Sequence, residues 1–175
     1  MTFSLYDAII PGNQQIVGAV IGLIEKAEAH CAETDGCTEE DLVQAKLAED
    51  MLPLAFQVKW VTTHSMGAIE GVRQGKFSPD VAPPPATLAD LKSGLARTRD
   101  ELAALTAAEV NGFVGKDMVF AFNEMEIPFT AENFLLSFSQ PNFYFHATTA
   151  YDILRHRGVK LGKRDFLGQM RVKAG

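Results

Sequence analysis

Four histidines are the side chains of this 175-residue chain with the widest range of possible chemistry. An imidazole can bind a metal ion, exchange a proton or recognise a ligand near neutral pH. His30 and His156 fall near the ends of expected helices, so we predict that both are exposed. His64 and His146 fall within expected helices, on faces that otherwise carry apolar residues. These two histidines are therefore the candidates for a site inside the protein.

Two interpretations of His64 and His146 remain open. Each could be a core histidine satisfied by a nearby hydroxyl or carboxylate, with Thr62, Thr149 or Asp50 as the partner. The alternative is a metal or ligand site between facing helices, where such sites are usually built. Zinc or nickel would suit imidazole nitrogens. Asp50 also recurs with His64 on one helical face, two heptads apart, which makes it a candidate third ligand.

The other reactive residues give weaker signals. Cys31 and Cys37 are separated by five residues, which is neither a redox C-x-x-C pair nor a zinc spacing. We interpret them as two unrelated thiols in a helix–helix connection, in preference to a metal site with His30 or a strained disulfide. Gly158–Lys163 is one residue too short for a phosphate-binding P-loop, and Arg164 stands where that loop needs Ser or Thr. The sequence contains no nucleophile motif of a known hydrolase class.

Helices must position these histidines. The first is expected to begin near Ser4, to kink or break at Pro11, and to end at Asp35-Gly36. A second begins at Thr38 and runs to Gly71 or Gly75. We expect it to divide around Asp50–Pro53, with Asp50 as the cap of the longer piece.

Two further helices complete the expected core. One begins at Thr87, and its apolar seam has a regular three-four spacing, through Leu88, Leu91, Leu95, Thr98, Leu102 and Leu105. The last runs from Thr130 to Arg157, with Gly158 as its cap and a kink near Phe138 caused by Pro141. Its inward face is expected to comprise Leu135, Phe138, Asn142, Phe145, His146, Thr149 and Ile153.

The segments between these helices differ in character. Lys76–Pro85 is rich in proline and is expected to be extended. Residues 118–122 and 125–129 alternate apolar and polar positions around Asn123-Glu124, which predicts a β-hairpin with Pro128 in an edge strand. Residues 1–175 are thus expected to form a single domain. Its fold class is all-α, an antiparallel four-helix bundle with a small β-hairpin before the last helix.

Composition and charge narrow the possible functions. The chain is 47% hydrophobic and 22% charged, as is usual for a globular protein, and its net charge of -6 argues against nucleic-acid binding. The apolar run from Ile16 to Ile24 is too short to span a membrane, and no secretory signal is visible. We therefore expect a cytoplasmic protein. Seven bases and one acid follow from Arg155 onward, either to complement the helix dipole or to form a basic site for a phosphate or an acidic partner.

Several motifs resemble those of a known family. Asp50–Leu54, the pair His64 and His146, and above all 145–158 with 162–168 resemble a bacterial domain family of unknown function within the DinB/YfiT-like superfamily. The resemblance covers nearly the whole chain. It implies an antiparallel four-helix bundle that is often dimeric, and it implies a metal site in the members that bind metal.

The resemblance also implies where such a site would lie. Metal-binding members take one histidine from the second long helix and two, four residues apart, from the last, and some act as thiol S-transferases. By position, His64 is the first ligand and His146 is one of the second pair. This sequence has Asn142 and Ala150 where the other histidine of that pair would stand. Asp50 would then have to complete a zinc or nickel site.

Two functions follow from these residues. The first is a metal-free or weakly metal-binding homodimer, a binding or stress-related protein with a small-molecule or thiol ligand. Its pocket would be lined by Gln57, Trp60, His64, Asn142 and His146. The alternative is a metal-dependent enzyme, a thiol S-transferase or hydrolase, in which His64, His146 and Asp50 hold zinc or nickel.

Overall fold

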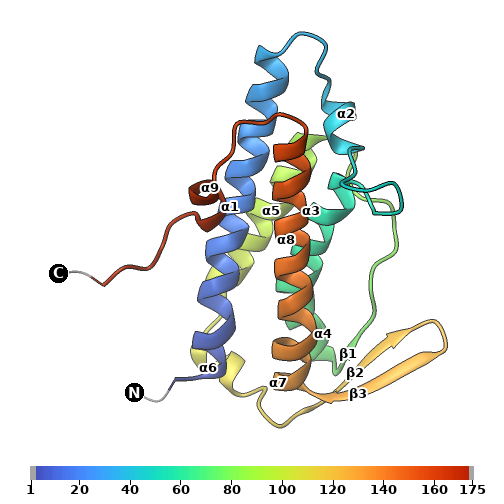
Figure 1. Cartoon of the computed structure of the whole chain (residues 1–175). Helices are drawn as coiled ribbons and strands as arrows, with labels where there is room; N and C mark the ends of the chain where they lie inside the picture. Colours follow the sequence, from blue (N-terminus) through green and yellow to red (C-terminus); the bar gives the residue numbers. More distant parts are fainter. Residues whose placement is uncertain (1–2, 174–175) are drawn as a thin grey trace.

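The computed structural model describes residues 3–173, which are mostly helical and include a small three-stranded sheet (Figure 1). The first helix, α1 (Leu5–Glu33), begins with a capping box in which Ser4 and Asp7 bond each other's backbone N–H. The expected break at Pro11 is wrong, because Pro11 lies inside one continuous helix. Apolar residues on both sides of Pro11 are buried in the same core, which holds the helix together despite the missing donor.

The second helical region divides as predicted. A short helix, α2 (Glu39–Val43), is capped by Thr38, and the longer piece comprises α3 (Leu54–Thr62), the π-helix η1 (Thr63–Gly67) and α4 (Ala68–Gln74). Gly75 ends it in the left-handed conformation, with φ 69°. Asp50 does not cap this piece. Pro53 occupies the N-cap position and Asp50 lies in an exposed turn, while the N–H of Leu54 donates to the carbonyl of Ala45 at 2.9 Å.

The third long helix, α5 (Leu88–Ala104), confirms its predicted cap and seam. Thr87 accepts a hydrogen bond from the backbone of Asp90, and all the predicted seam residues are buried. A short helix, α6 (Ala107–Asn111), follows. The three-four spacing was decisive here because only one face of α5 meets the core.

The sheet has the order β1-β2-β3. Strands β2 (Asp117–Phe122) and β3 (Met125–Thr130) pair antiparallel, and Asn123 makes the turn with φ 53°. Strand β1 (Lys76–Phe77) pairs parallel to β2 and was not expected, since two residues carry no alternation signal. Figure 1 shows the β2–β3 hairpin extending away from the helices.

The last helical region is not one regular helix. It comprises α7 (Ala131–Asn133), the π-helix η2 (Phe134–Ser139) and α8 (Gln140–His156), and Gly158 follows with φ 92°. The kink expected near Phe138 takes the form of this π-helix, just before Pro141, whose missing N–H interrupts the regular pattern. The inward placement of Phe145 is wrong, because Phe145 is 55% exposed.

The long helices enclose the core. Helix α1 packs against α5 and α8, and α3 also packs against α5 and α8 (Figure 1). The short helix α9 (Lys163–Leu167) packs on the outside of α1. Among the described residues, no helix is both long enough and apolar enough to cross a membrane.

Candidate functional site

His64 and His146 meet inside the protein. His64 comes from η1 and His146 from α8, and the two residues are only 3% and 6% exposed. Their rings are nearly parallel, with an interplanar angle of 11° and 5.7 Å between centroids. The half-buried indole of Trp60 lies edge-on to both, with its centroid 5.9 Å from that of His64 and 4.9 Å from that of His146. Three nitrogen-bearing rings thus form one buried cluster.

Two π-helices position His64. A π-helical turn shifts the backbone bonding pattern and often occurs at functional sites. The backbone carbonyl of His64, in η1, accepts a hydrogen bond from Ser139 Oγ at 2.8 Å, and Ser139 is the last residue of η2. This buried bond fixes the two irregular segments to each other. It therefore sets the position of His64 relative to α8.

Gln57 sets the tautomer of His146. The amide nitrogen of Gln57 donates to the carbonyl of Leu52 at 2.9 Å, so its oxygen faces the other way. That oxygen, Oε1, lies 2.8 Å from Nδ1 of His146. An amide oxygen can only accept, so Nδ1 carries the proton and Nε2 presents a lone pair. Histidines that bind metals or ligands are commonly oriented by such a contact at the second nitrogen.

Three buried nitrogens of this cluster have no hydrogen-bond partner among the described residues. They are Trp60 Nε1, His64 Nδ1 and His146 Nε2. The indole N–H is a donor, the His146 nitrogen is an acceptor, and the His64 nitrogen can be either. Unpaired buried polar atoms are costly and uncommon in folded proteins. Their concentration at one place makes this cluster the strongest candidate for a binding site.

Both imidazoles are neutral at physiological pH. Burial, and to a smaller extent the neighbouring His146, lower the pKa of His64 to about 3. Burial alone lowers the pKa of His146 to about 4. A neutral imidazole keeps the lone pair that a ligand or metal ion needs. The two imidazoles therefore contribute no charge to the site near neutral pH.

An aromatic shell surrounds the cluster. The rings of Phe77 and Phe138 lie 5.7 Å and 5.8 Å from that of His64, and the exposed ring of Phe145 lies 5.2 Å from that of His146. Sequence reasoning missed Phe77 and Ser139 as neighbours of the site. Phe77 belongs to a two-residue strand and Ser139 lies in a π-helix, so neither residue shows a regular spacing.

The family model described as a domain of unknown function, DUF1993, matches residues 5–167. The chain belongs to the DUF1993 family. A crystal structure of a DinB family member protein from Shewanella denitrificans is 28% identical to it, with a TM-score of 0.79, and the match covers 98% of this chain and 96% of that one. No curated protein matches the chain. The resemblance to a DinB-like domain of unknown function is thereby confirmed.

The ligand set of this DUF1993 protein does not fit a zinc site. Known structural and catalytic zinc sites use three or four protein ligands. Within residues 3–173, no group of three or more His, Cys, Asp or Glu side chains could hold a metal ion. His64 and His146 remain a pair, and Asp50 does not join them. The buried Ala150 supplies no donor at the position where the resemblance implies a histidine.

The expected hydroxyl and carboxylate partners of the histidines are also wrong. Thr62 donates to the carbonyl of Lys59 and Thr149 donates to that of Phe145, each within its own helix. Asn142, one turn before His146, uses its amide nitrogen in the same way, on the carbonyl of Phe138. Threonines in helices readily make such bonds to the preceding turn.

The remaining histidines and the cysteines depart in part from their predictions. His156 is exposed as expected, whereas His30 is half-buried and its Nδ1 lies 3.3 Å from the hydroxyl of Thr34. Cys31 and Cys37 do lie at a helix–helix connection, but they are not unrelated, because their sulfur atoms are 2.8 Å apart.

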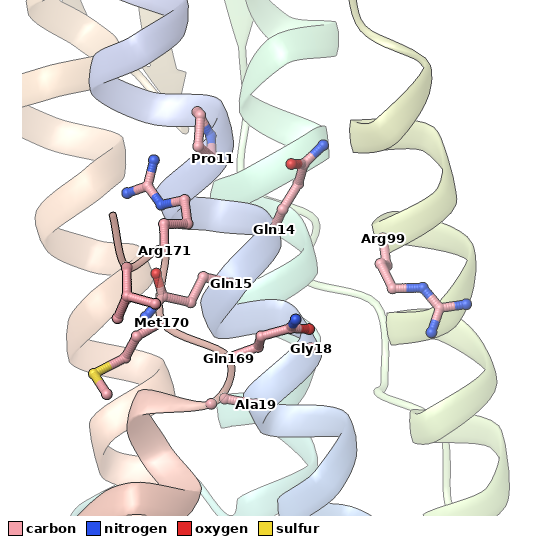
Figure 2. A pocket seen from close by; sticks show the side chains of 11 residues that line it. Pro11, Gln14, Gln15, Gly18, Ala19, Arg99, Gln169, Met170 and Arg171 are labelled. Atoms are coloured by element: carbon pink, nitrogen blue, oxygen red, sulfur yellow. The ribbon is translucent and has the colours of Figure 1, made fainter. Parts of the chain in front are cut away.

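A groove of about 730 Å³ lies between α1 and the basic C-terminal segment (Figure 2). Gln14 and Gln15 line it, but their amide nitrogens bond the carbonyls of Leu102 and Leu167. In Figure 2, Arg171 lies beside α1 and Arg99 belongs to α5 on the far side. Arg99 is paired with Asp100. Much of the polar lining of this groove therefore holds neighbouring segments together.

Proposed function

We propose that this DUF1993 protein binds a small, uncharged organic ligand between α3 and α8, without a resident metal ion. The single observation that carries the proposal is the pair formed by the His146 Nε2 lone pair and the Trp60 N–H, both buried in one cluster. A ligand with one donor and one acceptor would satisfy both nitrogens. Alcohols, amides and thiols have this pairing, and thiols match the chemistry expected from the resemblance.

The charge of the site supports an uncharged ligand. Both histidines are neutral, and Gln57 is the polar residue that contacts His146. Burying a charged ligand beside neutral groups would be costly without an opposite charge. The surrounding phenylalanines add apolar contact area, as small-molecule pockets commonly do.

Access to His146 is proposed to lie past Trp60 and Phe145. Trp60 is half-buried and Phe145 is exposed, and both rings contact the imidazole of His146. Rotation of these side chains would admit a small molecule while the helices stay in place. Exposed side chains change rotamer within nanoseconds, so such access is not slow.

We further propose that the chain folds as one antiparallel four-helix bundle domain and acts as a cytoplasmic homodimer. The packing of α1 and α3 against both α5 and α8 supports the bundle. Exposed apolar residues on η2 and α8, Leu136, Tyr144 and Phe145, support a contact surface next to the site.

The alternative is a metal-dependent enzyme that uses zinc or nickel. One observation favours it, since Gln57 orients His146 as carbonyl partners orient metal-binding histidines elsewhere. Two imidazoles alone are an incomplete ligand set, so this alternative requires a further ligand.

Trp60, the only tryptophan in the chain, reports on the site. Tag-free protein would be titrated with 2-mercaptoethanol, ethanol and acetamide, with and without EDTA, while the Trp60 emission is followed. We expect a saturable change with at least one compound that is insensitive to EDTA, is lost in His146→Ala and is kept in His156→Ala.

Calorimetric titration with Zn²⁺ and Ni²⁺ distinguishes the two functions. Weak metal binding that is unchanged in His64→Ala supports the metal-free proposal. Binding tighter than about 1 μM that is lost in both His64→Ala and His146→Ala would replace that proposal with the metalloenzyme.

A further inference from the structure

A second reactive pair lies at the C-terminal end of α1, on different elements from the histidine cluster. Cys31 lies in the last turns of α1, and Cys37 lies in the connection to α2. Their Sγ atoms are 2.8 Å apart, and both are half-buried free thiols. A disulfide bond is about 2.05 Å long, so the sulfurs need to approach by only about 0.8 Å.

The backbone holds the two thiols in this position. The N–H of Cys37 donates to the carbonyl of Thr34 at 3.1 Å, which closes a tight turn after α1. Gly36 completes the turn at φ 78°, a left-handed conformation that favours glycine. Thr38 then caps α2 through the N–H of Asp41. Cys37 is thus turned back onto α1, held by its own N–H on one side and followed by the Thr38 cap on the other.

The surroundings give the two thiols different roles. Cys37 lines an open cavity of about 370 Å³ together with His30, Asp41 and Arg157, whereas Cys31 lies outside that lining. Burial, the contact with Cys37 and the nearby acids Glu39 and Asp41 raise the pKa of Cys31 to about 12. Cys31 therefore stays a protonated thiol until a disulfide forms beside it. Cys37 is the thiol that meets solutes first.

We propose that Cys31 and Cys37 form a reversible intramolecular disulfide by exchange with a low-molecular-weight disulfide of the glutathione type. The Cys37 thiolate attacks one sulfur of that disulfide, forms a mixed disulfide and releases one thiolate. The Cys31 thiol then gives its proton to the solvent, and its sulfur attacks Cys37 and releases the second thiolate. The protein loses two electrons and two protons, and one small disulfide becomes two thiols.

The product would join the end of α1 to the start of α2 covalently. The same connection lines the cavity beside His156 and Arg157, at the end of α8. Oxidation would therefore fix one wall of that cavity. This modification is independent of the proposed function, because the thiols lie in α1 and its connection to α2, whereas the histidine cluster is built from α3, η1 and α8.

The full chain would be equilibrated without oxygen in mixtures of oxidised and reduced glutathione, then quenched with N-ethylmaleimide. We expect both cysteines to become unreactive together, with a mass about 2 Da lower and no glutathione adduct, and full reversal by dithiothreitol. Persistent free thiols, a stable adduct or a disulfide between two chains would each overturn the proposal.

Two variants and a denatured control test the geometry. Cys31→Ser should stop at a glutathione adduct on Cys37, and Cys37→Ser should form its adduct on Cys31 at least about tenfold more slowly. The reverse order of rates would contradict the assigned order of attack. The native chain should form the disulfide at least about tenfold more favourably than the chain in guanidinium, because folding sets the effective concentration. Equal values in the two states would show that the fold does not position the pair.

Discussion

The amide oxygen of Gln57 lies 2.8 Å from Nδ1 of His146, and this contact joins α3 to α8 in the core. Gln57 is only 2% exposed, and its amide nitrogen is already bonded to Leu52. The glutamine amide therefore cannot turn over without breaking both hydrogen bonds. Its orientation fixes which nitrogen of His146 is free to bind.

Replacing this glutamine should release the tautomer. In Gln57→Leu, Nδ1 of His146 loses its acceptor, so the proton should redistribute between the two ring nitrogens. Nitrogen NMR of the imidazole would show the fraction protonated at Nδ1 falling, and denaturant unfolding should show a loss of about 1–3 kcal/mol. Gln74→Leu, at an exposed position of α4, should change neither measurement. An unchanged His146 tautomer in Gln57→Leu would contradict the assignment.

Acid should destabilise the protein through the two histidines. Their pKa values fall from 6.5 in the unfolded chain to about 3 for His64 and about 4 for His146. Between the lowered pKa values and 6.5, the unfolded state therefore binds more protons than the folded state. The contribution of the two histidines to the free energy of unfolding is fully present above pH 6.5 and decreases as the pH drops towards 4. Each histidine should account for about 2 kcal/mol between about pH 7 and about pH 4.5.

Denaturant unfolding at several pH values would test this. The double variant His64→Gln and His146→Gln should show a flatter pH dependence than the original chain, since the carboxylates titrate equally in both. His156→Gln, which changes an exposed histidine, should keep the original slope. Matching slopes in the double variant and the original chain would mean that the buried imidazoles are not the source.

Regular helices could be predicted from the sequence, and irregular ones could not. The seam of α5 has a clean spacing from Leu88 to Leu105, and Thr87 is a strong cap signal, so both were confirmed. The π-helix η1 contains no proline, and its extra residue is stabilised by contacts such as the one from Ser139 to His64. Such tertiary contacts leave no local pattern in the sequence.

The candidate site was predictable in part for the same reason. The facing positions of His64 and His146 follow from helical periodicity, and the structure brings them together with Gln57 and Trp60. The hydrogen-bond partner of His146 could not be chosen among several polar residues, because that choice depends on how α3 and α8 are aligned. Asp50 was placed wrongly since the chain leaves the helical path before Pro53.

The proposed homodimer makes its own prediction. Phe145 is 55% exposed and Leu136 is 40% exposed, on the same helical region of the chain. If these residues meet a second copy, Phe145→Gln should weaken the dimer at least about tenfold, because buried aromatic residues contribute strongly to interfaces. Light scattering over a dilution series measures this. Val81→Gln, at another exposed apolar position, is the matched control. A monomer at about 100 μM would contradict the proposal.

Two glycine-to-alanine changes should act in opposite directions. A Cβ at Gly71 would lie 2.9 Å from the Cβ of Phe77, whereas a Cβ at Gly22 of α1 would meet nothing within 4 Å. Gly71→Ala should therefore cost about 1–3 kcal/mol through overpacking, and Gly22→Ala should add about 0.5–1 kcal/mol through helix propensity. Phe77 contacts the ring of His64, so Gly71→Ala should also shift the His64 ring resonances, and Gly22→Ala should not. Denaturant unfolding and NMR of the two variants measure both effects. Equal stability in the two variants would show that Phe77 can move aside, and that its packing does not hold His64 in place.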